Sequence, residues 1–173
     1  MKTRTGLLVW GALSLAGLAL VWQTAHPPAW VSWEEGQLPG TPELRVEDRT
    51  LTIWEGDTLL WETEPGIQVQ DVLREDLDRD GGEEILVLCW RRGTYGPNRP
   101  FWVKENPRHW SQHIFIYRWT GEEMNPLWMA SELGRQVESW SFDPVRRLVL
   151  TDRQGRTTAW DWRDWGLTNI PLR

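Results

Sequence analysis

The sequence predicts an all-β domain of about eleven short antiparallel strands in three similar units, preceded by an N-terminal hydrophobic helix. Two observations support this fold class. From residue 44 onward, short segments with alternating apolar residues are separated by turn residues, and no segment with helical periodicity exceeds about two turns. In addition, three segments share one pattern, in which a strand ending in tryptophan is followed by a turn and a second strand.

The shared pattern predicts three β-hairpins, over residues 50–61, 114–128 and 157–170. Additional strands are expected before them, at residues 43–47, 67–73, 84–90, 137–142 and 147–151. Trp119 and Trp162 are 43 residues apart, which is within the period of a four-stranded propeller blade. We therefore interpret the three units as blade-like, and we expect the first unit to lack its innermost strand.

The number of units limits how the domain can close. Three blades are fewer than the four to eight that close a propeller. We expect the units either to pack as an open or irregular stack of sheets, or to complete one propeller as a homodimer. Fifteen tryptophans are spread along the whole chain, and this distribution predicts that they pack between sheets.

The N-terminus predicts where the protein is located. Residues 6–22 form an apolar run whose only polar side chain is Ser14, and Lys2 and Arg4 precede it. This pattern predicts a single-pass anchor over residues 1–23, with the C-terminal domain on the outer side of the cell membrane. A cleaved signal peptide, which would make the protein secreted, is the alternative.

The next segment, residues 24–43, contains four prolines and two glycines and has no periodicity, which predicts a stiff spacer. The β-domain is expected over residues 44–173. The formal net charge of −6 opposes binding to nucleic acid. Cys89 is the only cysteine, so an intramolecular disulfide is excluded, and its place in an apolar run predicts that it is buried.

The strongest motif is an acidic loop that leads directly into an apolar strand. Carboxylates stand at its first, third, fifth and ninth positions, and glycines allow the backbone to curl around a common centre. An all-oxygen shell of this kind suits Ca²⁺. The predicted ligands are Asp76, Asp78, Asp80, the carbonyl of Gly82, and Glu84. An EF-hand would need an acid at position 12, where Val87 stands; the alternative interpretation is a solvated acidic turn.

Residues 69–87 also resemble a known repeat. Asp71-Val followed by Asp76-x-Asp-x-Asp-Gly-x-x-Glu-Ile-Leu-Val is similar to the FG-GAP/VCBS-type repeat of integrin α-subunit propellers and of many exported bacterial proteins. The resemblance implies β-propeller-like blades and calcium bound by the same five residues. At the corresponding place, the third unit has only the short turn 142–147 without these acids, so we expect one metal site.

A loop of about twenty residues, 91–110, interrupts the second unit, and loops of this length are usually functional or disordered. It combines five basic residues with aromatic ones, the composition of a binding hot spot. The candidate partner-binding residues are Arg91, Arg92, Tyr95, Arg99, Phe101, Trp102 and Lys104. The expected partner is a surface protein or a glycan. Alternatively, the loop caps the sheet stack and its arginines pair with neighbouring acids.

No catalytic motif is recognisable in the sequence. His109 and His113 are four residues apart, a metal-binding spacing on a helix, but they lead into a predicted strand. The sequence therefore favours an exported, membrane-tethered, calcium-binding module with a binding or structural role. The alternative is an envelope or secreted hydrolase that acts on carbohydrate polymers, since two distant carboxylates leave no local signature.

Overall fold

A computed structural model describes residues 26–95, 100–105, 107–130 and 132–171, and this part of the chain contains twelve strands and no helix. The first sheet contains β1 (Gly36–Leu38), β2 (Glu43–Glu47), β3 (Thr50–Glu55) and β4 (Thr58–Glu62). The second contains β5 (Ile67–Glu75), β6 (Glu84–Arg92), β7 (Trp110–Trp119) and β8 (Met124–Met129). The third contains β9 (Val137–Phe142), β10 (Leu148–Asp152), β11 (Thr157–Arg163) and β12 (Gly166–Ile170).

Each sheet is an antiparallel meander in which neighbours along the chain are neighbours in the sheet. All-β architecture and the three expected hairpins are confirmed. The expectation that the first unit lacks a strand is wrong, because β1 pairs with β2 from Gly36↔Val46 to Leu38↔Leu44. This strand has three residues, two of them exposed, so its sequence contains no apolar alternation that could reveal it.

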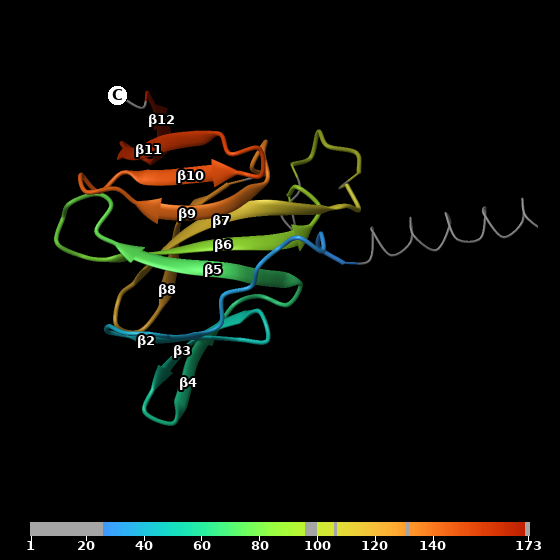
Figure 1. Cartoon of the computed structure of the whole chain (residues 1–173). Helices are drawn as coiled ribbons and strands as arrows, with labels where there is room; N and C mark the ends of the chain where they lie inside the picture. Colours follow the sequence, from blue (N-terminus) through green and yellow to red (C-terminus); the bar gives the residue numbers. More distant parts are fainter. Residues whose placement is uncertain (1–25, 96–99, 106, 131, 172–173) are drawn as a thin grey trace, which may run out of the picture.

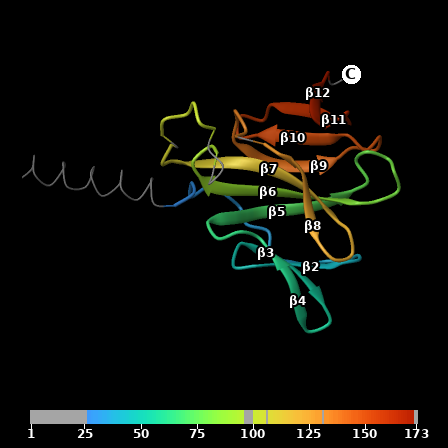
Figure 2. The same ribbon diagram turned by 180° about the vertical axis from the view of Figure 1, so that it is seen from behind.

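The three sheets are stacked as layers, with the second sheet between the other two (Figure 1; Figure 2 shows the same order from behind). Both faces of the second sheet are therefore buried. Along β6, Ile85, Val87 and Cys89 belong to a core shared with the first sheet. Leu86 and Leu88 belong to a separate core shared with the third sheet. This explains why residues 85–90 are continuously apolar rather than alternating.

Tryptophans fill the margins of these two cores, as their distribution along the chain predicted. Trp61 of the first sheet contacts Tyr117 of the second edge to face, with ring centroids 5.6 Å apart. Trp128 of the second sheet packs on the core shared with the third. The ring of Trp128 lies close to the backbone of Gly166, the first residue of β12. A Cβ atom at this position would stand 2.7 Å from Nε1 of Trp128, which explains the glycine.

The described part of the expected spacer, residues 26–43, packs against the sheets. Trp30 contacts Trp90 edge to face at 5.8 Å, and Val31 is buried. The amide of Glu34 donates to the carbonyl of Gln70 in β5. Together with β1, these contacts make residues 30–38 part of the domain, whereas the sequence predicted that the domain begins at residue 44.

The two ends of the second sheet carry different loops. At one end, β5 and β6 are joined by residues 76–83, which together with Glu84 form the acidic loop. At the opposite end, β6 and β7 are joined by residues 93–109, the aromatic loop. Residue 30 lies at this second end as well, since Trp30 contacts Trp90 near the end of β6 (Figure 1). We call the two ends of the molecule the acidic end and the aromatic end.

Candidate metal site

The acidic loop is held in a curled conformation by its own backbone. Arg79 and Gly81 have positive φ values of 63° and 95°, which turn the chain back on itself. Leu77 is buried and packs into the core between the second and third sheets, so the loop is anchored at its start. The glycine at position 81 meets the requirement of the left-handed conformation at low steric cost.

Each aspartate of the loop uses one carboxylate oxygen to accept a backbone hydrogen bond. Oδ2 of Asp76 accepts from the amide of Gly81 at 3.3 Å. Oδ1 of Asp78 accepts from the amide of Asp80 at 3.2 Å, and Oδ1 of Asp80 accepts from the amide of Gly82 at 2.9 Å. These bonds fix the carboxylates and leave the second oxygen of each one outside the backbone hydrogen bonds of the loop.

Glu84 closes the loop and is its most buried acid, with a side chain only 1% exposed. Its Oε2 accepts from the amide of Leu77 at 2.8 Å, which ties the end of the loop to its beginning. Burial raises the pKa of Glu84, because a charged carboxylate loses solvation there, although hydrogen bonds from Arg118 and Leu77 act in the opposite direction.

Three of the five predicted ligands converge. Asp76, Asp78 and Glu84 each offer a carboxylate oxygen, and these three atoms lie within 4.8 Å of one another. Asp80 does not belong to this group, and the amide of Gly82 donates to Oδ1 of Asp80. The structure therefore supports an acidic triad that could hold a metal ion, and it leaves the identity of the ion undetermined.

An arginine that the motif did not reveal interacts with the same carboxylates. Arg118 of β7 lies opposite Glu84 of β6 in the strand register. Its Nε donates to Oε1 of Glu84 at 2.9 Å. Its two terminal nitrogens donate to Oδ2 of Asp80 at 2.9 Å and to Oδ2 of Asp78 at 2.8 Å. Only the pairing of β6 with β7 brings these residues together, since 34 positions separate Glu84 from Arg118 in the sequence.

These hydrogen bonds change the proton affinities of the groups involved. The pKa of Asp80 is lowered, first by the hydrogen bond from the amide of Gly82 and then by the charge of Arg118. The pKa of Arg118 is raised, because hydrogen bonds to Glu84 and Asp78 favour its charged form. The three groups with shifted pKa values, Glu84, Asp80 and Arg118, therefore lie together at the acidic end.

A second arginine approaches the loop from the third sheet. Arg146, in the turn between β9 and β10, pairs with Glu75, and its Nη1 lies 3.9 Å from Oδ2 of Asp76. The five carboxylates around this point therefore face two guanidinium groups, which leaves three negative charges uncompensated by these contacts. The carboxylates concerned are Glu75, Asp76, Asp78, Asp80 and Glu84.

Asp76 has a carboxylate oxygen whose hydrogen-bonding capacity is not satisfied by the protein. Its Oδ1 is buried and has no hydrogen-bond partner, while its Oδ2 receives the amide of Gly81. A buried carboxylate oxygen without a donor is costly, and such groups are usually satisfied by protein, water or a metal ion. Asp76 is one of the three acids of the triad, so a cation bound there in contact with this oxygen would satisfy it.

The candidate partner-binding residues are distributed over two environments. Arg91 turns inward: its Nε is buried, its Nη2 donates to the carbonyl of Thr94 at 2.8 Å, and its guanidinium lies over the ring of Phe115. Arg92 lies over the ring of Trp110. In contrast, Phe101 and Trp102 are 94% and 71% exposed. Tyr95 is half-buried and Lys104 is exposed, whereas Arg99 lies outside the described residues.

The two histidines are in different environments. His113 is fully buried in β7, where Nδ1 donates to the carbonyl of Ala130 at 3.0 Å and Nε2 accepts from the hydroxyl of Ser111 at 2.8 Å. His109 is exposed, and its Nε2 lies 3.7 Å from Oε1 of Glu132. The strand geometry thus gives them separate partners.

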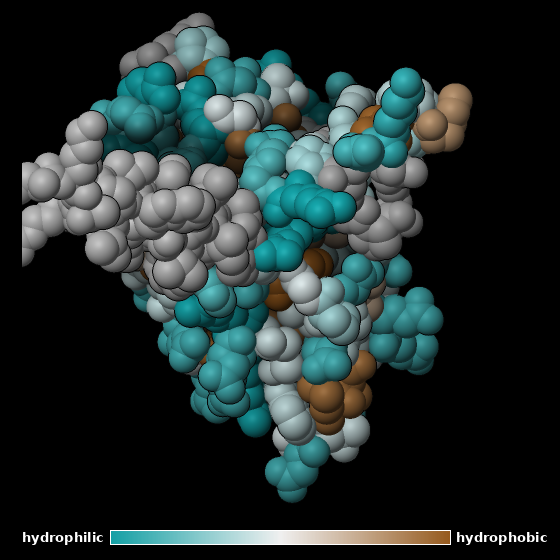
Figure 3. All heavy atoms as spheres, turned by 90° about the vertical axis from the view of Figure 1, so that its right-hand side faces the viewer, coloured by the Kyte–Doolittle hydropathy of each residue, from teal (hydrophilic) through white to brown (hydrophobic). Residues whose placement is uncertain are grey.

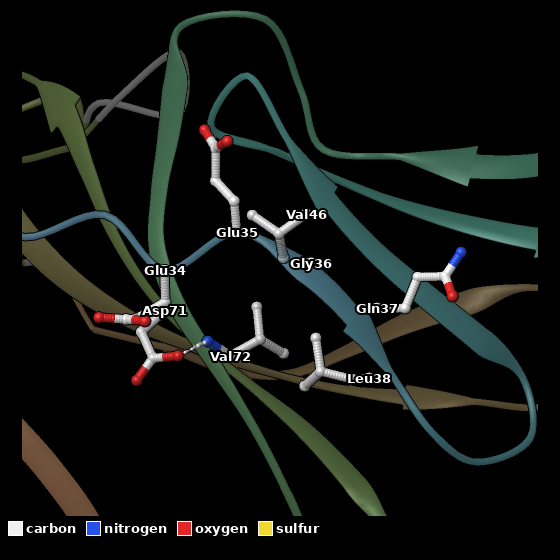
Figure 4. A pocket seen from close by; sticks show the side chains of 8 residues that line it. All are labelled: Glu34, Glu35, Gly36, Gln37, Leu38, Val46, Asp71 and Val72. Carbon is white, nitrogen blue, oxygen red and sulfur yellow. Dashed lines mark hydrogen bonds between the residues drawn. The ribbon is translucent and has the colours of Figure 1, made fainter.

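One pocket was missed by the sequence reasoning. It lies beside β5, where apolar side chains of the first and second sheets form one side and the carboxyl groups of Glu34 and Asp71 lie next to each other (Figure 4). Asp71 accepts hydrogen bonds from the amide of Val72 at 2.7 Å and from Nε1 of Trp140 at 2.6 Å. Burial raises the pKa of Asp71. Glu34 belongs to the segment expected to be a spacer, so no pattern indicated that it would meet Asp71.

Comparisons with protein-family models, with curated proteins and with solved structures found no match to this chain. In the described ranges there is also no helix of the length and apolar character that a membrane crossing requires. Residues 1–23, for which the sequence predicts an anchor or a signal peptide, lie outside those ranges.

Proposed function

We propose that the acidic loop binds one calcium ion and that the ion stabilises the acidic end of a non-catalytic module. The observation that carries this proposal is the unpartnered, buried Oδ1 of Asp76, a residue of the acidic triad whose carboxylates converge. Hard oxygen donors and net negative charge favour a divalent cation such as Ca²⁺ over softer metals. The resemblance of residues 69–87 to FG-GAP/VCBS-type repeats supports the same ion.

Arg118 and the ion compete for the same oxygens. In the absence of metal, Arg118 contacts Asp78, Asp80 and Glu84 and supplies part of the positive charge that the loop requires. A calcium ion between the acids would displace the guanidinium from at least part of this set. Asp80 would then be released from Arg118, and together with the carbonyl of Gly82 it would complete the shell of five protein ligands.

The loop is suited to a structural role because it joins two sheets. Arg79 of the loop lies 3.5 Å from Asp161 of β11, and Arg146 of the third sheet contacts Glu75 and Asp76. A bound ion would fix the conformation from which these contacts are made. We therefore propose a calcium staple between the second and third sheets rather than a calcium sensor, in blade-like units carried outside the cell by an N-terminal anchor.

The experiment that tests this proposal is thermal unfolding with calcium or with EGTA. Extracellular sites often have Kd values near 0.1–1 mM, so roughly 10 mM calcium would add about 1.4–2.7 kcal/mol to the free energy of unfolding. We expect the wild type to melt several degrees higher with calcium. Asp78→Asn should lose this shift, whereas Asp57→Asn, in an exposed turn of the first sheet, should retain it. Equal melting with calcium and EGTA in the wild type would contradict the proposal.

A second candidate function is hydrolysis of carbohydrate polymers, and the pocket at Asp71 is the observation that favours it. Paired carboxyl groups are the usual machinery of glycoside hydrolysis, and a raised pKa suits a general acid. Release of reducing ends from polysaccharides by the purified protein, abolished by Asp71→Asn, would support this activity. If none is released, the binding or structural role stands.

A further inference from the structure

The aromatic loop ends in two exposed aromatic side chains that pack on each other. The ring centroids of Phe101 and Trp102 are 4.8 Å apart in an edge-to-face arrangement, and both side chains remain exposed. The local chain is ordered by a hydrogen bond from the amide of Val103 to the carbonyl of Pro100 at 3.0 Å. An exposed aromatic pair of this kind marks an interaction surface.

The surroundings of the pair are basic. In residues 91–110 there are five arginines and lysines and one acid, Glu105, so the segment has a net charge of +4 on a chain whose total is −6. Among the described residues of this segment, Arg92, Lys104 and Arg108 are exposed. Trp and Phe combined with Lys and Arg are typical of segments that lie in the interface of a phospholipid bilayer.

The position of the loop adds a geometric constraint. The aromatic loop and the blue segment with which the described chain begins lie at the same end of the molecule, opposite the acidic end (Figure 1). In the sequence, only residues 23–25 separate His26 from the apolar run 6–22. Even a fully extended chain spans roughly 14 Å over these four steps. If the run enters a bilayer, the aromatic end therefore faces the lipid surface.

The view onto this end shows a mainly hydrophilic surface with smaller separate hydrophobic patches (Figure 3). The acidic loop lies at the far end of β6, roughly 30 Å away along nine residues of strand. The charge distribution therefore places basic residues toward the expected membrane and the cluster of carboxylates away from it. The basic residues of the aromatic end would attract an anionic surface, and the distant carboxylates of the acidic end would repel it only weakly.

We propose that the aromatic loop docks on an anionic phospholipid surface, with Phe101 and Trp102 in the interface and Lys104 and Arg108 at the headgroups. This inference rests on the proposed N-terminal anchor and is independent of the metal site. The docked loop would provide a second point of attachment, so the domain would be held in a fixed orientation on the membrane instead of swinging on its N-terminal segment. Lipid is favoured over a protein or a glycan by the proximity of the loop to residue 26.

The test uses the full chain with a fluorophore at one of two valines. Val103→Cys places an environment-sensitive probe beside Phe101 and Trp102, and Val145→Cys places it in an exposed turn at the acidic end. Cys89 is buried and burial raises the pKa of its thiol, so the native cysteine will not compete for the label. Each protein is reconstituted into vesicles of phosphatidylcholine and phosphatidylglycerol that contain nitroxide-labelled acyl chains.

We expect a blue shift and quenching of the probe at position 103, and neither change at position 145. Trp102→Ser in the Val103→Cys background should abolish the quenching, whereas Trp165→Ser, an 80% exposed tryptophan between β11 and β12, should preserve it. Vesicles without phosphatidylglycerol should give weaker quenching. Absence of quenching at position 103, equal quenching at both positions, or no dependence on phosphatidylglycerol would overturn the inference.

Flotation of the same vesicles separates this inference from the proposals on which it rests. A chain that floats without quenching at position 103 retains the anchor and overturns only the docking loop. A chain that does not float overturns the anchor and the docking loop together. Neither result affects the calcium site, because that site is measured by thermal unfolding.

Discussion

Arg118 shows how a single positively charged side chain can occupy the carboxylates that a metal ion would bind. Its guanidinium contacts Asp78, Asp80 and Glu84, the acids that the sequence assigns to a metal ion. Its own side chain is 30% exposed, so the contacts with the two aspartates are partly screened by solvent, whereas Glu84 is buried. The energetic weight of Arg118 therefore lies mainly in its bond to Glu84.

This asymmetry gives a prediction for Arg118→Met. In EGTA, the substitution leaves Glu84 buried without its charged partner, and we expect a loss of about 1–3 kcal/mol in the free energy of unfolding. In calcium, removal of the competing cation should tighten the Kd for calcium several-fold and restore much of the lost stability. Calcium titrations of the wild type and the variant measure the Kd, and urea unfolding in EGTA and in calcium measures the change in stability. An unchanged Kd would show that Arg118 and the ion do not compete.

His113 is the residue whose protonation should most affect stability in mild acid. Burial lowers its pKa to about 4, from an ordinary value near 6.5, with a smaller opposing effect of the hydrogen bond to Ala130. The unfolded chain therefore takes up a proton at pH values where the folded chain remains neutral. Stability from this residue is complete above about pH 6.5 and is lost as the pH falls toward 4.

We therefore expect His113→Gln to have a flatter pH dependence than the wild type. Between pH 7 and pH 4, the wild type should lose about 3 kcal/mol more than the variant, at about 1.4 kcal/mol per pKa unit. Urea unfolding of both proteins at the two pH values, in EGTA, measures the difference and removes any contribution from metal. Parallel pH profiles would show that His113 is protonated in the folded protein.

Between elements, a buried side-chain amide contributes to the joint of the second and third sheets. Nε2 of Gln112 in β7 donates to Oε1 of Gln70 at 2.7 Å and to the carbonyl of Val137 at 2.9 Å. The amide of Val137, the first residue of β9, donates back to Oε1 of Gln112 at 2.7 Å. Since this pair of bonds to Val137 is buried, it fixes where β9 begins relative to β7.

Gln112→Met keeps the length of this side chain and removes its hydrogen bonds. The buried amide of Val137 would lose its partner, so we expect a loss of about 1–3 kcal/mol. Gln154→Met, at an exposed turn, is the matched control and should change stability by less than about 0.5 kcal/mol. Urea unfolding measures both values. Hydrogen exchange at Val137 should accelerate in the first variant alone, and equal exchange in both would contradict this assignment of the joint.

On the scale of the whole molecule, the two ends are expected to act independently. The acidic end carries the triad and its arginines, the aromatic end carries Phe101 and Trp102, and the full length of β6 separates them. The acidic loop contacts Asp161 through Arg79, whereas the aromatic loop contacts Glu132 through Thr94 and His109. Sites at this distance without shared partners usually contribute additively.

The prediction is that EGTA lowers the melting temperature but leaves the spectrum of a probe at position 103 on vesicles unchanged. Conversely, Trp102→Ser should abolish lipid contact without altering the calcium-dependent shift in melting. Both expectations are checked by measuring the melting temperature and the spectrum of the probe at position 103 with calcium and with EGTA. A calcium-dependent change at position 103 would show that the ends are coupled through the second sheet.

Much of the fold could be predicted because its signals are local. Strand alternation, turn residues and the spacing of tryptophans located eleven of the twelve strands, and the boundaries of β2 agree with the prediction. The exception, β1, is too short to show a period and lies among prolines and glycines that indicate a spacer. Its strand character arises from pairing with β2, which is a tertiary effect.

The sequence by itself determined the chemistry of the acidic loop, since the spacing of Asp76, Asp78 and Glu84 and the glycine at position 81 are local properties of the chain. Only the tertiary structure decided which charges oppose that loop. Arg118 and Arg146 reach it across strand register and across sheets, over separations that no local pattern records. The same holds for the aromatic loop: its composition is a property of the sequence, but its position at the same end of the molecule as Trp30 follows from the direction of β6 and from the packing of Trp30 on Trp90.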